Sequence, residues 1–372
     1  MTYKPLLLLF TATLALFESS EIGLAKTYTQ TGYGLTAYSS KKFHTVKNID
    51  YFVAHKETYS YSPNYQILKT FQTTPANYAS IGGNHMVRVS TDLFLPVSYH
   101  QSGDLGNPQS MALTPSSQAA YVMYTKTGGS NTGFVVHYNL AQLRKTIHAT
   151  DNWAVIRQAT NALQKNKNTA QYQTVLANIK VGPTFKTGHG QSLAMNPKNN
   201  QLWFVQNSGI AGGYATVQRL SKSTLKPCTT LHYRLRSSRH NRATMGNNLT
   251  FDRSGHAYFS SYVSGSHQLK IYQGTLSTRQ TRFKLIMQGL ANRPGTKNQS
   301  IGYNAANNRL YFVSDDSVSS VPIAKLGHLH PSDVHATTFN SGREFEGLTF
   351  SQNGHGYLLT NKGAEILTGN FD

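Results

Sequence analysis

The sequence of 372 residues contains a single cysteine, Cys228. An internal disulfide therefore cannot form, and the fold must be held by a buried core, for which a chain of this length is sufficient. Cys228 follows Pro227 in a connecting segment. We interpret it as an incidental small residue, and a reactive or intermolecular thiol is the alternative.

Long hydrophobic runs are also missing, except at the N-terminus. There, "MTYKPLLLLFTATLALF" carries one lysine followed by an apolar run too short to span a membrane. Because "GLA" at 23–25 suits signal peptidase, we expect a signal peptide over 1–25 and a single secreted, extracellular domain over 26–372 without a transmembrane segment. Glu18 and Glu21 lie close to that cleavage site, so a retained N-terminal anchor is the alternative.

Acidic residues are scarce: 15 Asp and Glu stand against 35 Lys and Arg, a net charge of +20. Such an excess concerns partners and solubility rather than fold. We expect association with anionic cell-wall polymers, glycans or an anionic membrane surface, and only non-specific binding of nucleic acid. The densest basic stretch, "RLRSSRHNR", supplies the candidate contacts Arg234, Arg236, Arg239 and Arg242, although a solvated basic face would give the same pattern. The composition is also typical of a Gram-positive exporter.

Familiar catalytic motifs are absent from the sequence. It has no G-x-S-x-G elbow, no P-loop, no H-E-x-x-H and no paired cysteine ligands. We therefore assign no catalytic residue from motifs, and a binding or adhesion role is favoured over an enzyme.

A repeat runs through the chain. Each copy has a polar residue, a small residue, a short apolar strand, a turn and an aromatic-rich strand. The five copies are "PQSMALTPSSQAAYVMY" from Pro108, "GQSLAMNPKNNQLWFVQ" from Gly190, "GNNLTFDRSGHAYFSS" from Gly246, "NQSIGYNAANNRLYFVS" from Asn298 and "FEGLTFSQNGHGYLLT" from Phe345. Further strands follow each hairpin, so the pattern predicts four antiparallel strands in about fifty residues, the unit of an all-β propeller.

The number of blades depends on the N-terminal region. Strands expected at 49–55, 65–71 and 86–95 favour six blades, with five as the alternative. The last copy ends early in "AEILTGNFD", and we expect a strand at 31–38 to complete its blade. The long first interval indicates a helical insertion at about 145–170, with Asp151 as the helix N-cap.

The innermost strand of each blade lines the channel of a propeller, so the residues opening these strands should form a ring at one mouth. They are Gln109, Gln191, Asn247, Asn248, Gln299 and Glu346, with His189 just before one of them. Such a ring of amides and one carboxylate has oxygen atoms for a cation or a polar ligand. The alternative is structural: the side chains bind neighbouring blades and channel water.

Two resemblances follow from these motifs. "FEGLTF" and "GNNLTF" resemble the six-bladed lactonase and phosphotriesterase propellers, which implies a calcium-dependent hydrolase with Glu346 and Asn248 as metal ligands. Three openings here carry Gln and none carries Asp, which departs from that family. The "LTF" strand, "NG" turn, aromatic strand and short chain end resemble the large heat-labile helveticin-type bacteriocins over the last third of the chain, which implies killing of related bacteria.

Overall fold

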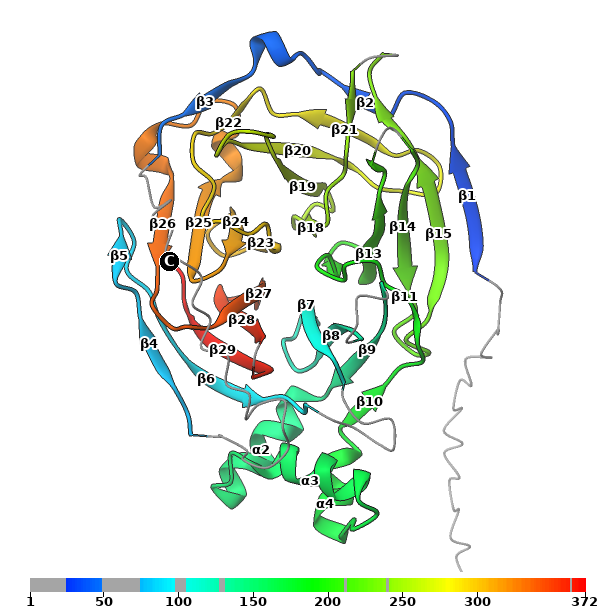
Figure 1. The fold of residues 1–372 in the computed structure, drawn as a ribbon, viewed down its shortest axis with the longest axis vertical. Helices are drawn as coiled ribbons and strands as arrows, with labels where there is room; N and C mark the ends of the chain where they lie inside the picture. Colours follow the sequence, from blue (N-terminus) through cyan, green and yellow to red (C-terminus); the bar gives the residue numbers. More distant parts are fainter. Residues whose placement is uncertain are drawn as a thin grey trace, which may run out of the picture.

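The computed structural model describes residues 25–48, 74–97, 105–126, 131–210, 213–238, 241–361 and 363–372. In this part of the chain, five sheets of four or more strands stand around a central axis like the blades of a propeller (Figure 1). The all-β propeller predicted from the repeat is confirmed. The preference for six blades was wrong, because the described residues contain five such sheets, one for each copy of the repeat.

The blades are formed by consecutive strands, with N-terminal strands added at their outer edges. Blades one and two contain β7 (Asn107–Leu113), β8 (Ala120–Thr125), β9 (Thr132–Tyr138), β10 (Ile179–Val181) and β11 (Phe185–Lys186), then β12 (Ala194–Asn196), β13 (Gln201–Ser208), β14 (Ala215–Leu220), β15 (Pro227–Tyr233) and β1 (Lys26–Gln30). Blade three contains β18 (Thr250–Phe251), β19 (Ala257–Tyr262), β20 (Leu269–Thr275), β21 (Arg282–Leu285), β22 (Gln288–Leu290), β2 (Leu35–Thr36) and β3 (His44–Val46). Blades four and five contain β23 (Ile301–Asn304), β24 (Arg309–Ser314), β25 (Ser317–Pro322), β26 (His335–Thr338) and β5 (Gly82–Gly83), then β27 (Glu344–Phe350), β28 (His355–Asn361), β29 (Glu365–Asn370), β6 (Arg88–Phe94) and β4 (Asn77–Ala79).

The inner strands form a closed ring. Each contacts the next in the order β7, β12, β18, β23 and β27, and β27 contacts β7 (Figure 1). The last blade is completed by β6, which pairs antiparallel with β29. Completion by an N-terminal strand was expected, but the choice of 31–38 was wrong: Leu35 and Thr36 instead pair with β21 of blade three. The strand expected at 86–95 thus closes blade five, while 49–55 and 65–71 lie outside the described residues.

Hydrophobic clusters fill the spaces between blades. Alternate residues of one strand pack against the two neighbouring blades on either side. Val122 of β8 belongs to a cluster with Leu359 of blade five, whereas the next residue, Met123, belongs to a cluster with Leu202 of blade two. Because successive side chains of a strand point to opposite faces, each blade is covered on both sides only when a neighbour stands on each. Closure of the ring thereby buries the apolar residues of every blade.

The turn after each inner strand is held by one polar side chain at the same place in the repeat. Its oxygen accepts a backbone N–H from the turn, as in the bond from Ala306 N to Asn304 Oδ1 (2.9 Å) and that from His256 N to Asp252 Oδ1 (2.9 Å). The equivalent residues in the other copies are Thr114, Asn196 and Ser351. Short polar side chains favour such turns because they bind backbone a few residues ahead.

Three helices interrupt blade one, where one was expected. They are α2 (Leu140–Thr150), α3 (Val155–Gln164) and α4 (Ala170–Leu176), which lie outside the sheet at the lower edge of Figure 1. Asp151 is the left-handed C-cap of α2 rather than an N-cap, so that prediction was wrong. Arg157 of α3 is buried and donates to the carbonyls of Leu95, Gly363 and Ala364, which fastens the helices to blade five.

Candidate functional site

Four of the polar residues that open the inner strands meet on the propeller axis. Glu346 is 1% exposed, and the side chains around it are those of Gln109, Gln191 and Gln299, which are also buried. Their convergence follows from the repeat, because each opens the inner strand of its own blade. Together they close the channel at one end, and we call them the axial ring.

Glu346 is the acceptor at the centre of the axial ring. Its Oε1 accepts from Gln109 Nε2 at 3.2 Å and from Asn361 Nδ2 at 3.4 Å, and its Oε2 accepts from Gln191 Nε2 at 3.4 Å. Gln191 also donates to Gln299, whose Nε2 donates to Asp315 Oδ1 at 3.3 Å. The amides thus form a continuous network around one carboxyl group.

Burial raises the pKa of Glu346 well above its ordinary value, and the nearby Glu344 and Asp315 carboxylates raise it further. The amide donors of Asn361 and Gln109 act in the opposite direction, since hydrogen bonds stabilise the charged form. The result is a buried carboxyl group that holds a proton more readily than a surface glutamate does.

The remaining residues of the expected ring lie apart from Glu346. Asn248 is buried, but its side chain donates to Ser260 Oγ and Asn298 Oδ1 and accepts from Ser260 N. Asn247 is exposed to solvent. Partial desolvation of His189 lowers its pKa from the ordinary value. Within the described chain, none of the three is hydrogen-bonded to Glu346.

The axial ring also depends on residues that the sequence did not single out. Asn361 and Asp315 join the network from other strands and turns, and no pattern in the sequence marks them. The repeat pattern did mark the small residue that follows the polar opening residue. Ser110 Oγ accepts from Leu193 N (3.1 Å), and Ser300 Oγ accepts from Leu348 N (3.2 Å), so each binds the inner strand of the following blade.

The residues implied for calcium do not fit that ion as arranged here. Calcium takes six to eight oxygen ligands. Both oxygens of Glu346 already accept amide donors, and Asn248 turns its oxygen to the backbone of Ser260. Within the described residues, no group of three or more His, Cys, Asp or Glu side chains lies close enough to hold a metal.

Arginines stack on tyrosines at three places in and between blades two and three. Since neighbouring strands alternate in direction, Tyr214 before β14 and Tyr262 at the end of β19 lie where the inner strands begin. Tyr33 lies beside the turn between β20 and β21, because its neighbour Gly34 accepts a hydrogen bond from Phe283 N. The three pairs have guanidinium carbon to ring-centroid distances of 4.2 Å for Arg234 over Tyr214, 4.9 Å for Arg236 over Tyr33 and 4.3 Å for Arg293 over Tyr262. Arg242 is exposed on the hairpin of β16 (Leu235–Arg236) and β17 (Arg242–Ala243), whereas Arg239 lies outside the described residues. We call the three arginine–tyrosine pairs together with Arg242 the ring-side face.

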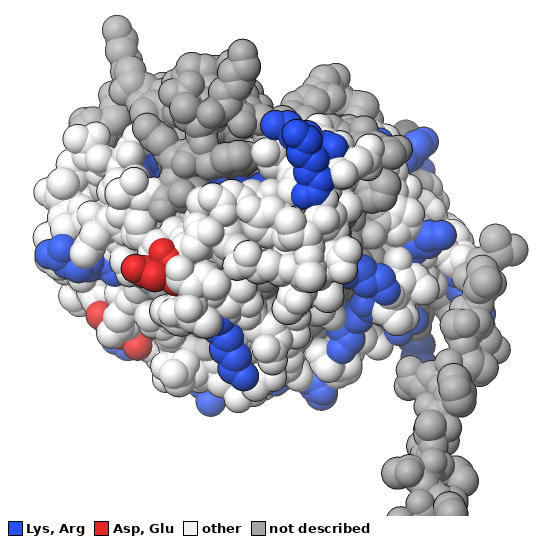
Figure 2. All heavy atoms as spheres, turned by 90° about the horizontal axis from the view of Figure 1, so that it is seen from below, with Lys and Arg blue, Asp and Glu red and all other residues white. Residues whose placement is uncertain are grey.

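Seen from the side of the helices, lysines and arginines are spread over the visible face and acidic residues are few (Figure 2). No helix among the described residues is long and apolar enough to cross a membrane.

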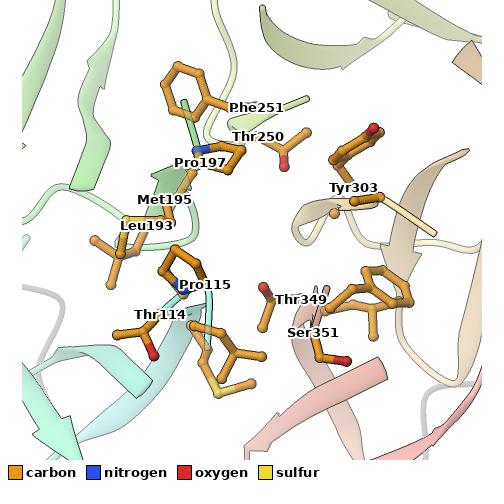
Figure 3. Close-up of a pocket in the computed structure, with 18 of the residues that line it drawn as sticks. Thr114, Pro115, Leu193, Met195, Pro197, Thr250, Phe251, Tyr303, Thr349 and Ser351 are labelled. Atoms are coloured by element: carbon orange, nitrogen blue, oxygen red, sulfur yellow. The ribbon is translucent and has the colours of Figure 1, made fainter. Parts of the chain in front are cut away.

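A cavity of about 190 Å³ occupies the other half of the channel (Figure 3). All five blades contribute to its wall through the later residues of their inner strands and the turns that follow. Its lining includes Pro115, Met195, Pro197, Thr250, Tyr303 and Thr349.

Comparisons with known proteins leave the family open. No family model and no curated protein matches the chain. A structure described as a gluconolactonase is 18% identical, with a TM-score of 0.30, covering 48% of this chain and 57% of its own. A protein of unknown function from Bacteroides thetaiotaomicron (9%, TM-score 0.40) covers 80% and 76%, and the soluble aldose sugar dehydrogenase of Escherichia coli (11%, TM-score 0.37) covers 77% and 100%. These likenesses are too low to carry an argument, and the fold is established by the strand pairing itself.

Proposed function

We propose that this chain is a secreted, non-catalytic binding protein whose ring-side face holds anionic polymers of cell surfaces or the extracellular space. The observation that carries the proposal is the set of three arginine–tyrosine pairs in and between blades two and three. Stacking on an aromatic ring orients the guanidinium groups of Arg234 and Arg236 while leaving N–H groups able to bind phosphate or carboxylate. A net charge of +20 adds long-range attraction to such polymers.

The axial ring favours binding over catalysis. Its polar groups are buried and bonded to one another, so the ring supports the channel end beneath the ring-side face. We infer that affinity comes from the half-buried arginines of the ring-side face rather than from the channel floor.

The test is retention on purified cell wall and on immobilised heparin. We expect the double variant Arg234→Gln/Arg236→Gln to bind about fivefold to thirtyfold more weakly, since each lost surface ion contact with the polymer is worth about 0.5–1 kcal/mol. The control is Lys165→Gln/Lys167→Gln, which removes the same charge from exposed positions that follow α3 in the helical insertion. Equal weakening by both pairs would contradict a specific face and leave only net charge.

A hydrolase is the second candidate, and the raised pKa of Glu346 is the observation that favours it, since buried carboxyl groups of this kind act as general acids. Hydrolysis of lactone or phosphotriester substrates, lost in Glu346→Gln, would support it. A helveticin-like bacteriocin remains a further proposal, tested by killing of related bacteria with the purified protein. Inactivity in both assays together with retention on cell wall would leave the binding role.

A further inference from the structure

The cavity at the far end of the channel lies apart from both the axial ring and the ring-side face. It begins below the ring, at the level of Met111 and Leu193, and extends to the turns that follow the inner strands. The buried axial ring separates it from the other mouth of the channel. A molecule that enters it therefore comes from the face formed by the turns that follow the inner strands.

The volume suits a small organic molecule. A cavity of about 150 Å³ with an apolar lining is enough for benzene, and a water molecule takes about 30 Å³ in the liquid. The 190 Å³ found here thus corresponds to about six water molecules or one chain of several carbons. Much of the wall is apolar, with Pro115, Met195 and Pro197 around the space (Figure 3).

Two hydroxyl groups reach into this space. Thr250 and Thr349 come from blades three and five, and their oxygens point toward the middle of the cavity (Figure 3). Within the described chain, neither hydroxyl has a hydrogen-bond partner, although Thr250 is buried. Such groups give a bound molecule a polar contact inside an otherwise apolar wall.

One cation stands at the rim. Arg253 lines the cavity, and its side chain is fixed by bonds from Nε to Tyr303 Oη (3.2 Å) and from Nη2 to the carbonyl of Ala305 (2.9 Å). The neighbouring carboxylate of Asp252 is turned into its own hairpin, where it accepts from His256 and Tyr258. The guanidinium group is therefore held beside Tyr303 and Ala305 of the cavity wall, and the Asp252 carboxylate is bonded within its own hairpin.

We propose that this cavity binds a short organic carboxylate, with its apolar tail inside the channel and its carboxylate at Arg253. The tail displaces water from the walls formed by the prolines and Met195, which is favourable in proportion to the apolar area covered. The carboxylate completes a charge-assisted contact with a guanidinium group that is already oriented. This site is independent of the polymer-binding face.

The test is calorimetric titration with three probes of equal chain length: hexanoate, hexanol and hexylamine. We expect hexanoate to bind most tightly and hexylamine most weakly. Arg253→Gln should weaken hexanoate about tenfold, to the level of hexanol, and leave hexanol unchanged, because the exposed arginine supplies only the charge contact. Thr349→Leu should weaken all three probes by filling the space, and Arg279→Gln should change none.

Two results would overturn the proposal. One is the absence of binding by all three probes, which would mean that the cavity holds only water. The other is equal binding of hexanoate and hexylamine with no effect of Arg253→Gln, which would remove the carboxylate assignment. Since Arg253 is exposed, its variant is expected to fold, and an unchanged melting temperature checks this.

Discussion

Gln109 Nε2 donates a hydrogen bond of 3.2 Å to Glu346 Oε1, although the two residues are 237 positions apart in the chain. They open equivalent strands of the first and last blades. The bond therefore spans the seam at which the propeller closes, and the other glutamines of the axial ring gather around the same carboxyl group.

Replacing Glu346 by Gln should stabilise the protein at neutral pH. A carboxyl group whose pKa is raised on folding costs stability as pH rises from its unfolded pKa near 4.5 through the higher folded value, and a neutral amide does not. A tenfold difference in proton affinity between the folded and unfolded chain corresponds to about 1.4 kcal/mol. Melting temperatures at about pH 4.5 and about pH 7.5 should show a gain for the variant that grows with pH; a loss at neutral pH would contradict the raised pKa.

The same substitution at Glu365 should have the opposite effect. Glu365 is 1% exposed, pairs with Arg343 Nη1 at 2.6 Å and accepts from Thr91 Oγ1 of the closing strand β6 at 2.5 Å. Glu365→Gln removes the charged partner that Arg343 contacts in a buried site, and breaking such a pair typically costs about 3–5 kcal/mol. Denaturant unfolding measures this, and a cost below about 1 kcal/mol would show that the pair does not hold the seam.

Ser110→Ala tests the small residue of the repeat. The change leaves the N–H of Leu193 without its acceptor at a blade interface, which costs about 1–3 kcal/mol. Ser116→Ala, on an exposed hairpin, is the control and should be nearly neutral. Equal effects in denaturant unfolding would mean that Ser110 does not join the blades.

His335 should make the fold sensitive to acid. Burial, with Arg309 and the stacked His85, lowers its pKa to about 4, while Asp333 acts in the other direction. A folded pKa below the unfolded value of 6.5 gives stability that is present at neutral pH and lost as pH falls from 6.5 toward 4.

His335→Phe keeps a ring against His85 but cannot be protonated. Its melting temperature should therefore fall less than that of the parent between about pH 7.5 and about pH 5, whereas exposed His148→Gln should follow the parent. Parallel pH profiles for the parent and His335→Phe would refute this role.

Binding to polyanions should strengthen in acid. The chain has 15 histidines, and unperturbed imidazoles gain charge below about pH 6.5. We expect the salt needed for elution from a polyanion column to rise between about pH 7.5 and about pH 5.5. Elution at the same salt concentration at both pH values would contradict this prediction.

The repeat predicted the fold well because each copy encodes a complete local unit. Each copy has a polar opening residue, an apolar strand and a turn residue, and the opening residues include Gln109, Gln191, Gln299 and Glu346. Because these residues hold equivalent places in equivalent blades, they must meet on one axis. Blade number was harder, since it depends on which distant strand joins an open edge. Residues 31–38 and 86–95 both have strand character, and only the full set of contacts selects β6 for blade five.

The site was predictable in position but not in bonding. In the third copy the place of the glutamines is taken by Asn247, which is exposed. Asn248 stands at the place of the small residue and binds Ser260 and Asn298 instead of reaching Glu346. Aspartate is a residue type favoured at helix N-caps, but Asp151 ends α2 because the insertion contains three helices rather than one. No sequence pattern predicts the cavity, because it is the space left between the inner strands of five blades.

A crystal structure tests the central claim most directly. The account predicts that the nitrogens of Gln109 and Gln191 lie close to the Glu346 carboxyl oxygens, near 3.2 and 3.4 Å, at one end of a channel enclosed by five inner strands. Electron density that placed these side chains in separate parts of the molecule would contradict it.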